Sequence, residues 1–419
     1  MVIMELTSEL KTIFSSLRHR NFRLFWSGQL VSLIGTWMQT VAQAWLVLDL
    51  THSSIKLGVV SALQFLPMLF LSFFTGPFID YFPKRKIIIW TQVALMSLAF
   101  ILALLVWTGR VQYWHIVVLA TLLGVVNTID MPARQSYLIE LVGKEDLMNA
   151  IALNSSIFNA ARAIGPAVAG MLITAAGTAF CFFMNGLSYI AVIAGLLAMS
   201  LEPSVRKDHP SYDVFKNMGE AVHSIRRNPV LLTTISLVAV VSVFGVNFNV
   251  LVPVFTRKEL GLDAAAFGFL MSSFGTGALL GSLLMVVMSR LGPKPAFLLG
   301  GGMGLSLFLV VIGMQKSYGM TAFLLFLTGL CMIIFFSTAN TLVQLNTEDR
   351  LRGRVMSLYT MSFGGLTPFG SLFAGTMAQW LHAPLTFALG GLITSSVFVR
   401  AIAKRKMLFG KVRSTGKED

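Results

Sequence analysis

Long runs without a charged residue recur along this chain and constrain its fold more than any other feature. The hydrocarbon core of a bilayer takes about 20 apolar residues per helix, so one such run spans it once and a run twice as long spans it twice. In hydrocarbon the backbone must satisfy its own hydrogen bonds, which leaves α-helices for segments of this length. The runs cover 24–48, 57–79, 87–109, 111–129, 163–201, 228–256, 264–289, 295–315, 317–347 and 355–399.

The runs predict an all-α polytopic membrane protein with twelve transmembrane helices. Eight runs suit one helix each, and the stretches 147–201 and 355–399 hold two helices each, with breaks expected near Gly177 and His382. Composition agrees, because 55% of the residues are hydrophobic and only 12% are charged. A soluble domain carries about 25% charged residues.

The positive charges gather on one side of the predicted membrane. Of the 32 Lys and Arg residues, 26 fall in the N-terminal arm, the loops on its side and the C-terminal tail, five fall on the opposite side, and Arg162 lies within a span. The positive-inside rule therefore predicts an integral, multi-pass cell-membrane protein with both termini in the cytoplasm. The net charge of +14 indicates attraction to the anionic lipid bilayer and no nucleic-acid partner.

A polar stretch divides the chain near its midpoint. Six spans precede it and six follow, and Gly124 and Glu145 of the first half match Gly329 and Glu348 of the second at a similar offset. Repeated six-helix halves with a binding site between them are a common plan of secondary transporters. The predicted parts are an N-terminal half at 1–201, a cytoplasmic linker with an amphipathic segment at 202–228, and a C-terminal half with a basic tail at 229–419.

The loop after the second span carries a glycine, an acid and a basic pair at fixed spacing. Gly76 is followed by Asp80 four residues later and then by Lys84 and Arg85. This pattern resembles the signature between spans two and three of the major facilitator superfamily. Motifs before the first span and around Arg134 resemble the branch that contains the enterobactin exporter and macrolide efflux proteins. The resemblance covers nearly the whole chain and implies the major facilitator fold, with two pseudo-symmetric halves around a central site.

The same resemblance implies a latch between the two halves in the outward-facing state. In it the Asp80 carboxylate would hold the start of span eleven. Tyr81 and Pro83 stand where the family pattern has a basic residue and a glycine, so the latch is expected to differ in shape. The alternative is that Asp80 is an ordinary solvated loop carboxylate. The predicted gating residues are Gly76, Asp80, Lys84, Arg85 and Arg134.

Arg162 lies inside the fifth span. An intramembrane arginine is costly and should face a cavity or a partner rather than lipid. It is expected either to bind an anionic group of the substrate, or to govern the proton affinity of a carboxylate. The alternative is a structural pair or network with Asp130, Asn127 or backbone carbonyls.

Asp130 closes the fourth span and is the carboxylate best placed to carry a proton. The alternative is that it is hydrated or paired with Arg134. No Asp or Glu stands at the centre of a predicted span. The prediction of protons as the coupling ion therefore depends mainly on the family resemblance.

Uncharged polar residues mark the helices that the resemblance places around the substrate cavity, namely spans one, four, seven and ten. Such residues on apolar helices suit an amphiphilic substrate. They serve equally well in hydrogen bonds between helices, which is the alternative for each residue taken alone. The predicted lining residues are Thr36, Gln39, Gln43, Asn127, Asn247, Asn340 and Gln344.

The chain carries no motif of an enzyme, and we expect no cofactor and no metal ion. The predicted function is export of small amphiphilic molecules, such as drugs, macrolides or siderophore-like compounds, by alternating access and proton antiport. The alternative is a carrier or flippase of lysophospholipids with the same fold. We expect the transporter to be a monomer.

Overall fold

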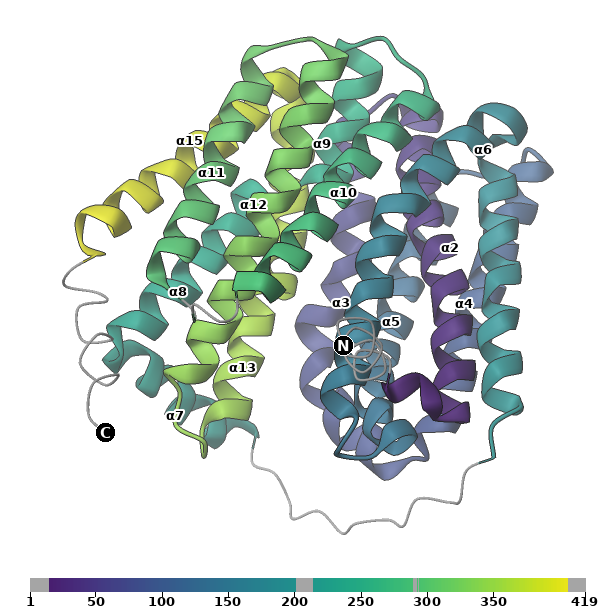
Figure 1. The fold of residues 1–419 in the computed structure, drawn as a ribbon. Helices are drawn as coiled ribbons and strands as arrows, with labels where there is room; N and C mark the ends of the chain where they lie inside the picture. The colour runs from purple at the N-terminus through teal and green to yellow at the C-terminus, as the bar shows by residue number, and fades with distance from the viewer. Residues whose placement is uncertain (1–14, 201–213, 289–291, 293, 406–419) are drawn as a thin grey trace, which may run out of the picture.

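A computed structural model describes residues 15–200, 214–288, 292 and 294–405, without the side chains of residues 73, 74, 77, 80 and 214–218. Its secondary structure over these residues is entirely helical. Figure 1 shows two helix bundles that lie together at one face of the molecule and separate toward the other. The face where the bundles separate is called the termini face, because α2 begins there and α15 runs toward it; the face where they lie together is called the opposite face.

Ten helices of the described residues are long and apolar enough to cross a membrane. The N-terminal bundle holds η1 (Ser15–Arg18), α2 (Arg20–Thr51), α3 (Ser54–Tyr81), α4 (Lys84–Trp107), α5 (Tyr113–Val142) and α6 (Leu147–Leu197). After α7 (Val214–Arg227), the C-terminal bundle holds α8 (Pro229–Val240), η2 (Val241–Gly245), α9 (Phe248–Val254), η3 (Phe255–Glu259), α10 (Ala264–Met288), α11 (Pro295–Met314), α12 (Tyr318–Leu345), α13 (Arg352–Thr360), η5 (Met361–Gly365), α14 (Thr367–Trp380) and α15 (His382–Ala403).

Two breaks complete the predicted set of twelve crossings. Gly177, with φ 80° and ψ 171°, divides α6 into two arms, and this left-handed conformation suits a residue without Cβ. The crossing from α13 through η5 to α14 ends just before His382, which has φ 64°. Both breaks lie where the sequence predicts them, and the all-α polytopic fold is confirmed.

The two bundles meet along two seams of close helix packing. In the first, α6 lies against α10, where a Cβ on Gly275 would come within 2.3 Å of the Arg162 carbonyl oxygen. In the second, α3 lies against α14, where Gly58 and Gly375 face each other. Small residues let helix backbones approach in this way within a membrane.

Basic and polar side chains at the termini face tie the N-terminal bundle together. Arg20 and Arg85 donate to the carbonyl oxygens of Ala198 and Leu197 at the end of α6, which would otherwise lack partners. Asp146 accepts hydrogen bonds from the Ser15 hydroxyl at 2.5 Å and the His19 ring at 2.8 Å. These two bonds hold the pKa of the Asp146 carboxyl below its usual range.

Residues 201–213 of the predicted linker lie outside the described residues, so its boundaries stay a prediction. Most of the rest of the linker forms α7, which overlaps the segment predicted to be amphipathic, residues 212–225. Glu220 on α7 accepts from Arg354 on α13 at 2.6 Å. The linker helix is thereby bound to the start of the eleventh crossing.

Candidate functional site

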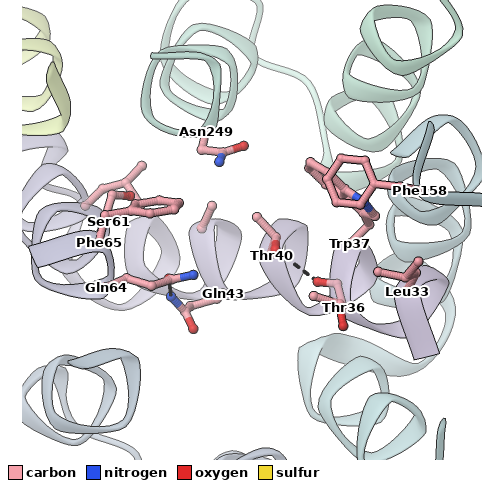
Figure 2. Close-up of a pocket in the computed structure, with 12 residues that line it drawn as sticks. Leu33, Thr36, Trp37, Thr40, Gln43, Ser61, Gln64, Phe65, Phe158 and Asn249 are labelled. Atoms are coloured by element: carbon pink, nitrogen blue, oxygen red, sulfur yellow. Dashed lines mark hydrogen bonds between the residues drawn. The ribbon is translucent and has the colours of Figure 1, made fainter. Parts of the chain in front are cut away.

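A cavity of about 170 Å³ lies between the two bundles, in the middle of the molecule. Figure 2 shows its wall, with most of the labelled side chains projecting from α2 and α3 and single ones from α6 and α9. Helices of both bundles therefore contribute to one site. The lining residues are Leu33, Thr36, Trp37, Thr40, Gln43, Ala44, Leu57, Ser61, Gln64, Phe65, Phe158 and Asn249.

The polar part of the wall is uncharged and already partly hydrogen-bonded. The Gln43 amide donates to the Gln64 carbonyl oxygen at 2.9 Å, which joins α2 to α3. The Thr40 hydroxyl donates to the Thr36 backbone carbonyl at 2.9 Å. A hydroxyl that donates in this way keeps lone pairs with which it can accept a bond from a ligand.

Aromatic rings form the other side of the wall, and one cation outside the lining packs against them. Trp37 and Phe158 meet edge to face, with ring centroids 5.8 Å apart. The guanidinium carbon of Arg162 lies 5.1 Å from the Trp37 ring centroid and 5.3 Å from that of Phe158. Cation–π attraction therefore holds Arg162 beside the cavity.

The ion pair predicted as an alternative for Arg162 is absent from the described part of the chain. Its buried Nε has no hydrogen-bond partner there. Asp130 instead pairs with Arg134 at 2.5 Å on the same helix. Within the described residues, Arg162 thus pairs with no carboxylate, and its guanidinium packs against two rings of the cavity wall.

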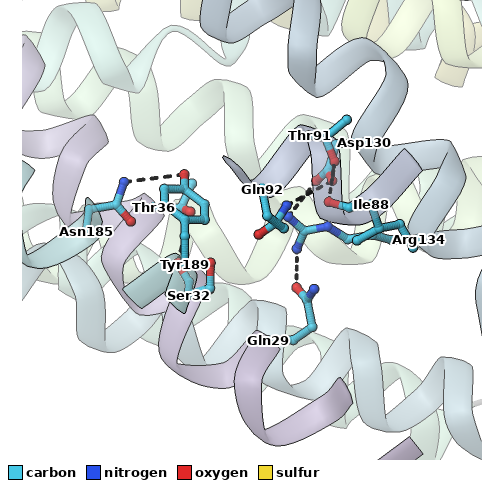
Figure 3. Close-up of polar contacts among 10 residues, drawn as sticks. All are labelled: Gln29, Ser32, Thr36, Ile88, Thr91, Gln92, Asp130, Arg134, Asn185 and Tyr189. Carbon is cyan, nitrogen blue, oxygen red and sulfur yellow. Dashed lines mark hydrogen bonds and ion pairs between the residues drawn. The ribbon is translucent and has the colours of Figure 1, made fainter. Parts of the chain in front are cut away.

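Asp130 stands at the centre of a polar network inside the N-terminal bundle (Figure 3). Its carboxylate is 2% exposed. It accepts from the Thr91 hydroxyl at 2.6 Å and from the Gln92 amide at 3.0 Å. Arg134 also donates to Gln29 on α2. Of the two interpretations of Asp130, the structure places it in the pair with Arg134, joining α2, α4 and α5.

The predicted gating residues do not meet across the two bundles in the described structure. Lys84 pairs with Glu140 of α5 at 2.5 Å, and Arg85 caps α6, so both act within the N-terminal bundle. Gly76 lies on the exposed surface of α3. The Asp80 side chain lies outside the described residues, and the latch stays a prediction.

Two of the seven predicted lining residues line the cavity, and five do not. Thr36 and Gln43 line the cavity, whereas Gln39, 5% exposed, accepts from Asn185 on the second arm of α6 at 2.6 Å. The others lie apart from the wall of this cavity. They are Asn127, half-buried on α5, Asn247, which donates to the Val243 carbonyl at the break before α9, and Asn340 and Gln344, which bond each other on α12.

The sequence analysis missed the contribution of the second crossing. Ser61, Gln64 and Phe65 on α3 line the cavity, although the family resemblance directs attention to spans one, four, seven and ten. The available signal was Gln64, a large polar residue within the charge-free run 57–79. It carried no information on which neighbouring helix it would face.

Polar contacts join the two bundles at the opposite face. Asp49 at the end of α2 pairs with Arg257 of η3 at 2.7 Å. The Arg257 guanidinium also lies 5.2 Å from the ring centroid of Trp45. Next to this pair, Lys258 donates to the Ser54 hydroxyl at 3.2 Å. These partners are distant in the sequence and were not predicted.

Replacing Asp49 by asparagine is expected to increase access to the cavity from the opposite face. The pair is partly exposed and worth about 0.2–1 kcal/mol, so the open population should rise by a factor of about 1.4 to 5. The measurement is the labelling rate of a Thr40→Cys variant by an impermeant maleimide added at that face. As a control, Glu259→Gln alters the Glu259–His382 pair at the same face but within one bundle. Equal rates with Asp49→Asn and with the control would contradict the prediction.

Residues 11–414 match the family model described as transmembrane secretion effector. The chain is 26% identical to the staphyloferrin A transporter of Staphylococcus aureus over 385 residues, which cover 89% of this chain and 93% of that protein. It is also 26% identical to the multidrug efflux pump Tap of Mycolicibacterium fortuitum, with 83% of this chain and 87% of the pump covered.

Solved transporters share the fold. A bacterial homologue of the human lysosomal transporter Spinster, in an inward-facing and unoccupied conformation, matches with a TM-score of 0.66 at 14% identity, over 94% of this chain and 97% of that one. The nucleoside transporter NupG matches with a TM-score of 0.71 at 11% identity, over 94% and 99% of the two chains.

Proposed function

We propose that this chain, which belongs to the transmembrane secretion effector family of major facilitator transporters, exports small amphiphilic molecules by alternating access. The observation that carries the proposal is the cavity between the bundles, which Asp49 and Arg257 join at the opposite face. Its wall combines amides and hydroxyls with aromatic rings, the mixture that suits an amphiphile. The names of the relatives, a siderophore transporter and a multidrug pump, agree with this substrate class.

The termini face is proposed to be cytoplasmic. The excess of Lys and Arg on that side of the chain supports this orientation by the positive-inside rule. The separation of the bundles toward the termini face in Figure 1 then corresponds to an inward-facing state. One chain supplies both bundles and the cavity, which supports a monomeric transporter.

Proton antiport is proposed to act through Asp130. Among the described residues it is the only acid with a buried side chain. A proton on its carboxylate would neutralise the partner of Arg134 and weaken the tie among α2, α4 and α5. Proton uptake by Asp130 would therefore change the position of α2 relative to α4 and α5. Since α2 lines the cavity, this change would reach the binding site.

Transport into inside-out vesicles with an imposed proton gradient tests the function. Dyes, macrolides and siderophores are offered in turn, and accumulation of at least one that disappears when the gradient is collapsed is the expected result. Accumulation that is indifferent to the gradient would refute antiport. Uptake of lysophospholipid alone would replace the proposal by the lipid carrier, and uptake of nothing would refute export.

A further inference from the structure

We propose that Arg162 is an anion-binding group of the cavity, so that the substrate carries a carboxylate beside an apolar ring system. The inference rests on the proposed function and narrows its substrate class. Arg162 lies on the first arm of α6, one helical turn after Phe158, which lines the cavity.

The position of the guanidinium favours a ligand in the cavity. Its carbon lies within 5.3 Å of the centroids of two rings, Trp37 and Phe158, that line the cavity. The side chain is only half-buried. Arginine presents five N–H donors in a planar fork, and no carboxylate of the described residues pairs with it, so its donors are left for an incoming acceptor.

The charges around the cavity favour a negatively charged ligand. The lining residues include no Asp or Glu. The nearby acids are used elsewhere, Asp130 by Arg134 and Asp49 by Arg257. A lipophilic cation would therefore meet Arg162 without a compensating acid, whereas a carboxylate would form a bidentate pair of the kind that arginine prefers.

The apolar part of the ligand follows from the same geometry. Trp37, Phe158 and Phe65 offer ring faces and edges around the cavity, and aromatic rings pack well on each other in offset or edge-to-face arrangements. Gln64 and Thr40 offer neutral hydrogen-bonding groups. A compact aromatic carboxylate fits all three features of the wall.

Arg162 also lies on the seam between the bundles. Its backbone carbonyl faces Gly275 of α10, and the neighbouring Ala163 carbonyl accepts from the Ser272 hydroxyl. The part of α6 that carries Arg162 is thereby packed against a helix of the other bundle. Binding at this point can bias how the two bundles sit against each other, as alternating access requires.

Equilibrium binding of a matched probe pair to the purified full-length protein in nanodiscs tests the inference. Dansylglycine carries a carboxylate, and dansylglycinamide is its neutral counterpart. The wild type should bind the acid about five- to tenfold more tightly than the amide, which is the factor by which a hydrogen bond to a charged group exceeds a neutral one in its contribution to binding. Arg162→Gln should remove the preference and leave the affinity for the amide nearly unchanged.

Two further variants keep the test decisive. Arg162→Lys should keep part of the preference, because lysine retains the charge but lacks the planar fork; it carries the test if Arg162→Gln does not fold. Lys316→Gln, which removes a cation in the loop between α11 and α12, should keep the full preference. Equal binding of the two probes by the wild type, binding of neither, or a preference that survives in Arg162→Gln would overturn the inference.

The vesicle assay separates this inference from the proposed function. Gradient-driven accumulation of amphiphiles by a wild type that binds both probes equally would leave the exporter in place and remove the anion site. Absence of accumulation for every amphiphile would refute the exporter, whatever the probe binding.

Discussion

Replacing Asp130 by alanine is expected to lower the free energy of unfolding by about 3–5 kcal/mol, the cost of leaving one charge of a buried ion pair without its partner. Asp130 is 2% exposed and pairs with Arg134, and it also accepts hydrogen bonds from Thr91 and Gln92. Its loss therefore leaves the Arg134 cation and the Gln92 amide without this acceptor, whereas the Thr91 hydroxyl can still donate to the Ile88 carbonyl. The measurement is the midpoint of thermal unfolding in detergent.

The double variant Asp130→Ala with Arg134→Ala should recover part of this loss, because it removes both charges. Asp349→Ala is the matched control, since Asp349 pairs with Arg352 but is 90% exposed. Exposed pairs contribute about 0.2–1 kcal/mol, so this control should unfold near the wild-type temperature. If Asp130→Ala also did so, the ion pair would not be structural. A loss of gradient dependence in that stable variant would assign Asp130 to coupling alone.

Replacing Gly277 by alanine is expected to cost several kcal/mol or to prevent folding. A Cβ at this position of α10 would lie 1.8 Å from the Phe326 carbonyl oxygen of α12. The clash is with backbone rather than with a flexible side chain, so the two helices must move apart. Overpacking of a tight interior costs about 1–3 kcal/mol, and occasionally more. The yield of folded protein by size-exclusion chromatography and its thermal midpoint measure the effect.

Gly300→Ala provides the contrast on the neighbouring helix α11. No atom lies within 4 Å of a Cβ built at Gly300, and alanine in a helix interior gains about 0.5–1 kcal/mol over glycine. This variant should match or exceed the wild type in stability. Similar losses of stability in both variants would contradict the prediction, because they would show that the close approach of α10 to α12 at Gly277 does not determine the loss.

The candidate site was predictable only in part. Four-residue spacing put Gln39 and Gln43 on one stripe of α2, yet Gln39 bonds Asn185 of α6 and Gln43 bonds Gln64 of α3. A helix inside a bundle has neighbours on several sides, so a shared stripe does not imply a shared cavity. The same reason explains why the lining residues of α3 were missed.

For Arg162, the sequence predicted that the position is exceptional but did not predict all of its neighbours. Its place inside a charge-free stretch marked it as exceptional, because burying a charge in a membrane is costly. Phe158 lies one turn earlier on the same helix and follows from four-residue spacing, but Trp37 comes from α2 and could not be foreseen. The pair of Asp49 with Arg257, 208 residues apart, was equally invisible.

The sequence by itself determined the helical membrane fold and the position of its breaks at Gly177 and His382. These properties are local, because each crossing must satisfy its own backbone hydrogen bonds within about 20 residues. Only the tertiary structure decided which side chains share the cavity, which charges pair, and where the bundles touch. Those outcomes depend on contacts between distant segments, such as Gly275 against Arg162, and no local pattern encodes the partner.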